Sequence, residues 1–225
     1  MADAPHSAEE LQQFYRARFG ERSDYRRKVW AVLVRFFSRW ISPDAEVLDL
    51  GCGWCEFINA VQCRTKLGMD LNPDAKQFAN PDVSILEQDC STRWGMAGDS
   101  LDAVFTSNFL EHLPTKLAVQ DTLAEAFRSL KPHGRFIAMG PNIRHVKGAY
   151  WDFFDHYVPL TERSLTEILQ KCGFEIEFCR ARFLPYTMSR GGEYPLWTLR
   201  AYLSLPFLWR FFGGQFLVVA RKPQA

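Results

Sequence analysis

Short apolar runs alternate with helical segments along the middle of the chain. The runs are nearly continuous rather than alternating, which predicts strands that are buried on both faces. They are EVLDLG (46–51), TKLGMD (65–70), VSILEQD (83–89), LDAVFTSN (101–108) and RFIAMG (135–140). Helices are predicted between them, most clearly from Thr115 to Leu130. This alternation is typical of βαβ units, so the sequence predicts a parallel sheet covered by helices.

The N-terminal part of the chain is predicted to be helical. Apolar residues recur by threes and fours between Ser7 and Trp40, with Arg and Lys between them, and Gly20 breaks the pattern into two helices. Such amphipathic helices are suited to cover an apolar surface. We interpret residues 1–42 as a lid over the ligand site.

The C-terminal part continues with a helix over 161–172, which Gly173 is expected to end in a left-handed conformation. Strands at 174–180 and 215–220 bring the predicted sheet to seven strands. We divide the single predicted domain of residues 1–225 into N-terminal helices (1–42), a core (43–182), an aromatic insert (183–214) and a final strand (215–221).

Composition and charge set broad limits on function. A chain of 225 residues suits one large domain, and 27 basic against 26 acidic residues give no field that would gather nucleic acid. The first residues lack a signal-peptide pattern, and no apolar run is long enough to span a membrane. Six cysteines are too few for a disulfide scaffold. We therefore expect a cytoplasmic protein that acts on a small ligand.

The segment VLDLGCGWCEF combines a strand, a glycine turn and the start of a helix, which we predict from Trp54 to Val61. Gly51 and Gly53 permit a ligand to approach backbone N–H groups there. Asp70 follows Gly51 by 19 residues, near the spacing at which an acid accepts ribose hydroxyls. Glu56 replaces the third glycine of a dinucleotide motif, and with Asp49 it would repel a diphosphate. A nucleoside that carries ammonium and sulfonium groups suits this site better.

These motifs resemble those of the class I, Rossmann-like S-adenosylmethionine-dependent methyltransferases. The resemblance runs from about Val47 to Ala220 through DLGCGWC, GMDLNPD, EQDC, LDAVFTSNFLEHLP, LKPHGRFIAMGPN and KCGFEIE. It implies a three-layer α/β/α sandwich with a seven-stranded, mostly parallel sheet whose last strand is antiparallel. It also implies S-adenosyl-L-methionine as the cofactor and methyl transfer as the activity.

The resemblance further implies eight cofactor-binding residues. The methionine end is lined by Asp49, Gly51 and Gly53, the ribose by Asp70 and Leu71, and the adenine by Asp89 and Cys90. The transferred methyl group is expected beside Asn108 and also beside Glu111 to Leu113. Asp70 and Asp89 have an alternative interpretation as turn or cap residues. The family usually has glycine where this chain has Cys55, which leaves the shape of the turn open.

The cysteines of this segment suggest two other chemistries. Cys52 and Cys55 have the spacing of a redox dithiol, and a helix N-terminus stabilises a thiolate, although the neighbouring carboxylates oppose this. Cys63 is a third candidate zinc ligand, but no fourth Cys or His follows at a customary spacing. We therefore expect no metal site.

Three residues are predicted to be catalytic. Asp155 and His156 adjoin in WDFFDHYVPL, and a carboxylate beside a histidine can set its tautomer and basicity, although sequence neighbours need not face each other. His112 follows the fourth strand, at the sheet edge where open α/β sheets bind ligands. The alternative is that the histidines only pack or contact the substrate.

The segment that follows Asn142 is the basis for predicting the methyl acceptor. This segment resembles type 11/12 methyltransferases found with bacterial polysaccharide biosynthesis, and its aromatic, Asp and His residues suit a sugar. We expect O-methylation of a sugar or saccharide intermediate. The alternatives are methylation of a quinone or lipid-like acceptor and a non-catalytic cofactor-binding module. The aromatic residues of 195–212 suit packing, a homodimer or a membrane interface, and few basic residues there argue against the last.

Overall fold

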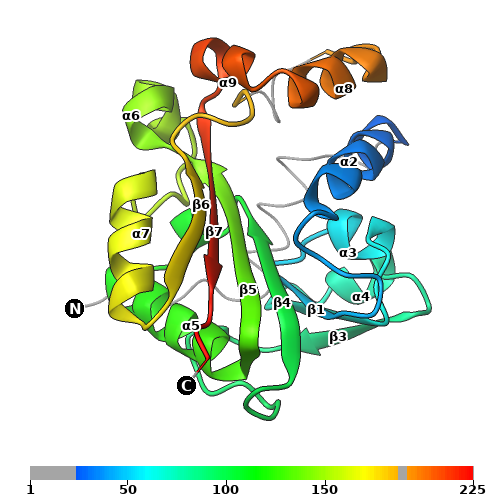
Figure 1. Cartoon of the computed structure of the whole chain (residues 1–225), viewed down its shortest axis with the longest axis vertical. Helices are drawn as coiled ribbons and strands as arrows, with labels where there is room; N and C mark the ends of the chain where they lie inside the picture. Colours follow the sequence, from blue (N-terminus) through cyan, green and yellow to red (C-terminus); the bar gives the residue numbers. More distant parts are fainter. Residues whose placement is uncertain (1–23, 187–191, 225) are drawn as a thin grey trace.

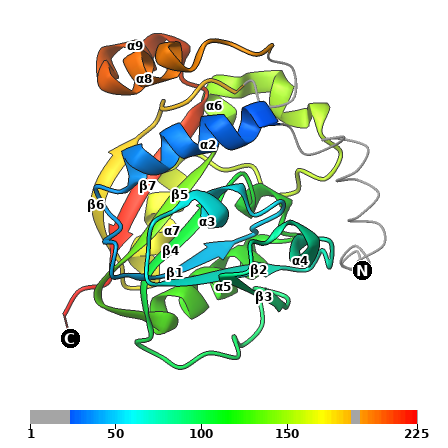
Figure 2. The same ribbon diagram turned by 90° about the vertical axis from the view of Figure 1, so that its right-hand side faces the viewer.

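The computed structural model describes residues 24–186 and 192–224, and these form a seven-stranded sheet with helices on both faces (Figures 1 and 2). The first of the two predicted N-terminal helices lies outside the described residues. The strands are β1 (Glu46–Leu50), β2 (Thr65–Asp70), β3 (Val83–Glu87), β4 (Leu101–Ser107), β5 (Leu130–Pro141), β6 (Glu175–Arg180) and β7 (Gln215–Arg221).

The sheet has the strand order β3-β2-β1-β4-β5-β7-β6. Strands β1 to β5 are parallel, whereas β7 runs antiparallel to both β5 and β6. The predicted mostly parallel sheet with an antiparallel last strand is therefore confirmed. The direction of strand order reverses at β1, which lies between β2 and β4, and ligands bind open α/β sheets outside the carboxyl ends of strands at such a point.

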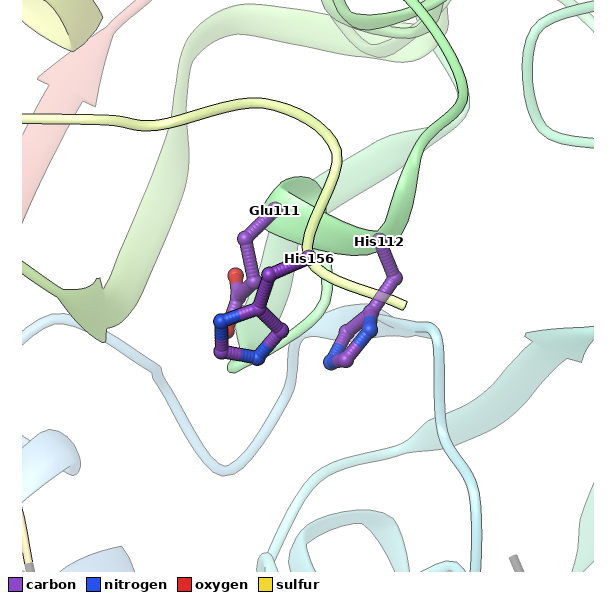
Figure 3. Close-up of side chains that lie close together, drawn as sticks. All are labelled: Glu111, His112 and His156. Carbon is purple, nitrogen blue, oxygen red and sulfur yellow. The ribbon is translucent and has the colours of Figure 1, made fainter. Parts of the chain in front are cut away.

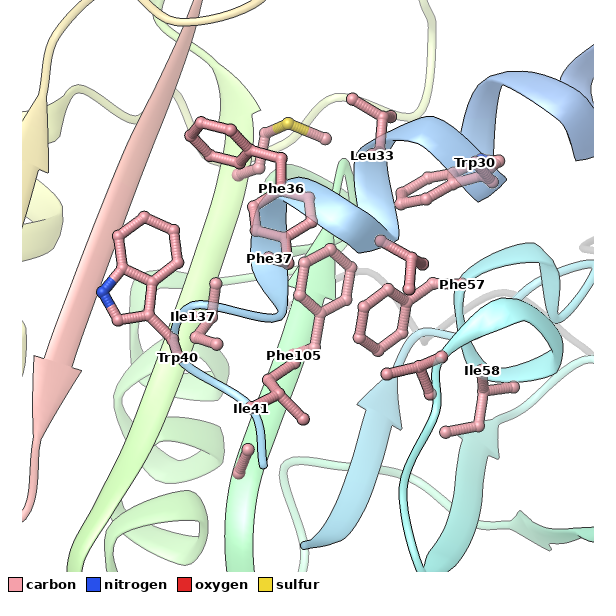
Figure 4. Close-up of a cluster of buried hydrophobic side chains, with 14 of the residues drawn as sticks. Trp30, Leu33, Phe36, Phe37, Trp40, Ile41, Phe57, Ile58, Phe105 and Ile137 are labelled. Carbon is pink, nitrogen blue, oxygen red and sulfur yellow. The ribbon is translucent and has the colours of Figure 1, made fainter. Parts of the chain in front are cut away.

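Alternate residues of the strands enter two separate apolar cores. On β4, Phe105 faces α2 (Asp24–Phe37) and α3 (Glu56–Ala60), whereas Val104 faces α5 (Lys116–Ser129) and α7 (Glu162–Lys171). Figure 4 shows the first core, where Phe37 of α2 meets Phe105 at 5.0 Å between ring centroids and Phe57 stacks on it at 3.7 Å. Burial on both faces explains why the strands read as continuous apolar runs.

Local signals fix the ends of the two long helices on the second face. The Thr115 hydroxyl accepts the N–H of Ala118 at the start of α5, and Thr161 begins α7 with a reciprocal bond to Ser164. Gly173 ends α7 with φ of 100°, as predicted.

The remaining short helices gather near the carboxyl edge of the sheet. They are α4 (Ala75–Phe78), η1 (Leu110–His112), α6 (Ile143–Val146), η2 (Lys147–Asp152), α8 (Leu196–Ser204) and α9 (Pro206–Phe212). Helices α6, α8 and α9 lie beyond that edge in Figure 1, and Trp209 anchors α9 by packing on Phe183 with ring centroids 5.0 Å apart. The aromatic insert is thus largely helical. No helix in the described part of the chain combines the length and apolarity needed to cross a membrane.

Several strand ends differ from the sequence prediction by one or two residues, and two boundaries have a clear physical reason. Strand β5 begins at Leu130, five positions before the predicted run at 135, because Leu130 already pairs with Leu101 ahead of an irregularity in the ladder. Helix α3 begins at Glu56 and not at Trp54, because Cys55 has a left-handed backbone that cannot continue a helix.

Candidate active site

The glycine turn joins β1 to α3 at the carboxyl edge of the sheet. Gly51 has φ of 71°, and a Cβ there would lie 2.2 Å from the ring of Phe109. The N–H of Gly51 donates to the carbonyl of Met69 at the end of β2 (2.8 Å). Gly53 also has a positive φ of 48°. Both backbone shape and space therefore require glycine at Gly51.

Cys55 occupies the usual glycine position without changing the left-handed shape of the turn. Its φ is 59°, and its buried Sγ lies 3.4 Å from the carbonyl oxygen of Ala75. A left-handed conformation costs a residue with a Cβ roughly 1–2 kcal/mol. The contacts of the buried sulfur offset part of that cost.

The cysteine pair lacks the environment of a redox dithiol. The Sγ atoms of Cys52 and Cys55 lie 3.9 Å apart, and both side chains are buried. The hydrogen bond with Cys55, followed by burial and the charge of Asp49, raises the pKa of the Cys52 thiol, so the reactive thiolate is disfavoured. No cysteine in the described part of the chain belongs to a cluster that could hold a metal ion.

Asp70 connects the end of β2 to the glycine turn. Its Oδ2 accepts the N–H of Gly53 (2.8 Å), and its Oδ1 accepts the N–H of Asn72 (2.9 Å). Burial raises the pKa of this carboxyl, and the hydrogen bonds oppose that shift. Asp70 therefore does stabilise the turn, which was the alternative interpretation of this residue. It is compatible with ribose binding, because each carboxylate oxygen accepts more than one hydrogen bond.

Asp49 concentrates negative charge beneath the same turn. Burial raises its pKa well above the ordinary range, and the charges of Asp70 and Glu56 raise it further. Arg26 of α2 reaches the turn, where its Nη2 lies 2.8 Å from Oε2 of Glu56 and its guanidinium lies over the Trp54 ring. Buried carboxylates that repel one another favour a cationic ligand and disfavour a phosphate.

Asn108 follows β4 in a strained conformation, with φ of 50°. Its N–H donates to the carbonyl of Met139 (2.8 Å), and its Nδ2 donates to the hydroxyl of Ser107 (3.0 Å). Its Oδ1 is buried and accepts no hydrogen bond from the residues that the structure describes. A buried acceptor of this kind, with the acids of the turn, fits a ligand that carries ammonium and sulfonium groups.

The residues predicted beside the adenine differ in their surroundings. Asp89 accepts the N–H (2.8 Å) and the hydroxyl (2.7 Å) of Ser91, so its turn interpretation is realised. Cys90 is buried against Thr122, and burial raises the pKa of its thiol to about 12. Leu71 exposes 38% of its surface and so presents an apolar face at the strand end.

The three predicted catalytic residues come together at η1. The Nδ1 atom of His112 lies 3.0 Å from Oδ2 of Asp155, and the rings of His112 and His156 are 4.8 Å apart between centroids. Asp155 therefore orients His112 from the other segment of the site.

The structure brings three further side chains to the histidines. Glu111, which the resemblance placed beside the transferred methyl group, belongs to the same cluster as the two histidines. Rings of Tyr150 and Phe153 lie 4.6 Å and 5.0 Å from the His156 ring. The Tyr150 hydroxyl donates to the carbonyl of Val158, eight residues later (2.6 Å), a contact that no periodic pattern predicts.

Comparison with solved structures shows the same fold in several methyltransferases. A structure from Thermotoga maritima, described as an S-adenosylmethionine-dependent methyltransferase and possible histamine N-methyltransferase, has a TM-score of 0.67 at 15% identity, over 96% of this chain and 97% of that one. An S-adenosylmethionine-dependent methyltransferase from Archaeoglobus fulgidus has a TM-score of 0.65 at 18% identity, over 94% and 99% of the two chains.

A third similar structure comes from the complex between the Haloferax volcanii methyltransferase activator Trm112 and its partner methyltransferase. It has a TM-score of 0.64 at 17% identity and covers 91% of this chain and 100% of that one. A search of the curated proteins found no significant match.

The family model described as "Methyltransferase domain" matches residues 22–177, which include the glycine turn, Asp70 and the histidine cluster. This match covers more than half of the chain, and the fold and site are those expected for S-adenosylmethionine as the cofactor. The chain therefore belongs to the methyltransferase domain family.

Proposed function

We propose that this methyltransferase transfers a methyl group to a hydroxyl of a sugar or saccharide intermediate. The observation that carries the proposal is the contact between Asp155 and His112 beside His156. Histidines so placed serve to remove a proton from an acceptor hydroxyl. N-methylation of an amine, by contrast, needs no such base once the amine is neutral.

The residues of the turn would hold the cofactor and those of η1 would prepare the acceptor. When bound, S-adenosylmethionine would supply an activated methyl group for the acceptor oxygen, and its sulfur would leave as a neutral thioether. Asp155 fixes the orientation of His112, and His156 takes the hydroxyl proton. Positioning contributes roughly 7–11 kcal/mol to such reactions, whereas a general base contributes about 10²- to 10⁴-fold.

Aromatic side chains near His156 support a saccharide acceptor. Trp151, Phe154 and Tyr157 belong to the same segment and expose 57%, 81% and 36% of their surfaces. Exposed rings next to buried polar groups are common in sites that recognise ligands with both apolar faces and hydroxyls. The pattern fits a sugar ring.

A lipid-like or lipid-linked acceptor is a second candidate, favoured by the surface of α8 and α9. Four large side chains there are more than half exposed: Trp197, Phe207, Phe211 and Phe212. An exposed apolar surface of this kind is typical of a site that contacts a partner or a lipid. The two helices lie beyond the carboxyl edge of the sheet, the edge that holds the site (Figure 1).

Two measurements test these proposals in order. Mass spectrometry of the purified protein should detect bound S-adenosylmethionine or its demethylated product, whereas an empty protein that also ignores added cofactor would contradict the assignment. Isotope transfer to matched panels of free sugars, lipid-linked sugars and quinones should then label a saccharide hydroxyl. Exclusive labelling of the quinones would refute the saccharide proposal, and loss of all labelling in a cofactor-binding protein would favour a non-catalytic module.

A further inference from the structure

Three side chains with metal-binding atoms converge at η1. Glu111 and His112 extend from η1, and His156 extends from the loop after η2, so that one ligand atom from each lies within 4.8 Å of the others (Figure 3). Glu111 and His156 are buried, and His112 is half-buried. Ligand atoms bound at about 2.0–2.2 Å to one cation lie roughly 3.0–3.6 Å apart in tetrahedral or neighbouring octahedral positions, so the side chains would have to approach one another by about 1–2 Å to close around an ion.

The backbone ties the two segments of this cluster together. The carbonyl of Glu111 accepts the N–H groups of Tyr157 (2.9 Å) and Val158 (3.1 Å). These bonds fix the loop next to His156 against η1. The Tyr150 hydroxyl donates a hydrogen bond to the carbonyl of Val158 and so restrains the same loop. The ligand atoms are therefore presented by a rigid frame, which a metal site requires.

Asp155 gives the second, independent observation. Its Oδ2 lies 3.0 Å from Nδ1 of His112, and its backbone carbonyl lies 3.0 Å from the same nitrogen. A proton on Nδ1 leaves Nε2 as the nitrogen with a lone pair. Histidines that bind metals almost always make this contact through the nitrogen that does not bind the ion.

We propose that Glu111, His112 and His156 bind a divalent cation whose open positions take two adjacent hydroxyls of the acceptor. Two imidazoles and one carboxylate suit Mn²⁺ or Zn²⁺ among the common ions. The proposal rests on the proposed function and narrows it to acceptors with vicinal hydroxyls. It departs from our sequence-based expectation of no metal, which considered only a zinc site built around Cys52, Cys55 and Cys63.

The cation would change how the acceptor is activated. A bound cation lowers the pKa of a coordinated hydroxyl, so the proton leaves to solvent and the oxygen keeps the electron pair with which it attacks the methyl carbon. The two histidines are then ligands instead of bases. An acceptor with a single hydroxyl would be activated less, because it fills only one open position of the cation and its orientation is not fixed.

Binding of the ion alone tests the site without any acceptor. Protein stripped with a chelator should bind one Mn²⁺ or Zn²⁺ in calorimetry, and His112→Ala, His156→Ala and Glu111→Gln should each weaken binding at least tenfold. Asp155→Asn should weaken it about 10- to 100-fold with the same stoichiometry, because Asp155 is a positioning residue. His133→Ala is the matched control, since His133 is exposed and lies outside the cluster.

The outcomes separate this inference from the proposed function. One ion per chain, lost in the cluster variants and kept in His133→Ala, supports the site even if no sugar is methylated. Absence of binding to the stripped protein, or equal binding by all variants, overturns it. Full activity of the stripped enzyme would also overturn it and would leave O-methylation with a histidine base intact. Circular dichroism of each variant identifies any that fails to fold, and Glu111→Gln keeps the shape of the buried side chain.

Discussion

The two halves of the proposed active site, one for the cofactor and one for the acceptor, are built in different ways. The cofactor half consists of the glycine turn with Asp49 and Asp70, and short-range geometry at two adjacent strand ends creates it. The acceptor half consists of Glu111, His112 and the segment around His156, and it exists only because a distant loop returns to η1. Binding and turnover should therefore respond to separate substitutions.

The largest expected effect comes from Gly51→Ala. The added Cβ would meet Phe109 at 2.2 Å in a backbone with φ of 71°, so the turn must change shape. Left-handed strain alone costs about 1–3 kcal/mol. We expect a lower melting temperature and no cofactor binding detectable by calorimetry. Gly148→Ala is the control, because nothing lies within 4 Å of the Cβ it adds; equal effects of the two would contradict this account of the turn.

Asp70→Ala should abolish measurable cofactor binding and preserve the fold. The change removes the acceptor for ribose hydroxyls and for the Gly53 N–H. Hydrogen bonds to a charged group contribute about 1.5–3 kcal/mol each, so two such bonds correspond to a loss of 100-fold or more. Calorimetry with S-adenosylmethionine measures the effect, with Asp82→Ala as a surface control. Unchanged affinity would remove Asp70 from the cofactor site.

His156→Ala should show the opposite behaviour. Cofactor affinity should remain within a few-fold of the parent protein, while turnover falls about 10²- to 10⁴-fold. The reason is that His156 belongs to the acceptor half, whether as base or as metal ligand. Single-turnover methyl transfer measures the loss once an acceptor is found. A matching loss of cofactor affinity would show that the two halves are not separable.

Asp49→Asn should stabilise the cofactor-free protein and weaken cofactor binding. The folded-state pKa of Asp49 lies above its unfolded value of about 3.8, so the native state holds the proton more tightly and its stability falls as pH rises through the folded pKa. The melting temperature of the parent protein should decline with rising pH through that window, and the variant should lose part of the decline. A rise of a few degrees near pH 8 is expected. Identical pH profiles would exclude Asp49 as a charged, destabilised group.

The smallest effect is expected at Cys55. Cys55→Gly relieves left-handed strain of roughly 1–2 kcal/mol but loses the packing of the sulfur, so the net change in stability should be below about 1 kcal/mol. Cys55→Ala keeps the Cβ and the strain while losing the sulfur, so it should be less stable than Cys55→Gly. Denaturant unfolding of Cys55→Gly and Cys55→Ala measures which of the two variants is the more stable. If the alanine variant is the more stable one, the turn is not strained at this position.

Sequence reasoning succeeded where local patterns carry the information. Period and burial predicted every strand of the sheet, and Thr161 with Gly173 marked the ends of α7. The same holds for the turn, where glycine and the downstream acid are a short-range pattern. The sequence-based prediction was less complete for the acceptor half of the proposed site. Asp155 contacts His112, which lies 43 positions away, and such a contact is set by tertiary packing. The resemblance placed Glu111 beside the methyl group but did not predict its cluster with the two histidines.

Asp70 stabilises the turn and is also our proposed ribose ligand, and this combination has a consequence for how the cofactor binds. Because the carboxylate already restrains the amides of Gly53 and Asn72, the turn is formed before the ligand binds, and little ordering of the loop remains for the association step. The two amide protons should exchange slowly with solvent even in the cofactor-free protein. Hydrogen exchange at these two amides therefore reports whether the turn is formed, and it can be measured in any variant even when the acceptor is unknown.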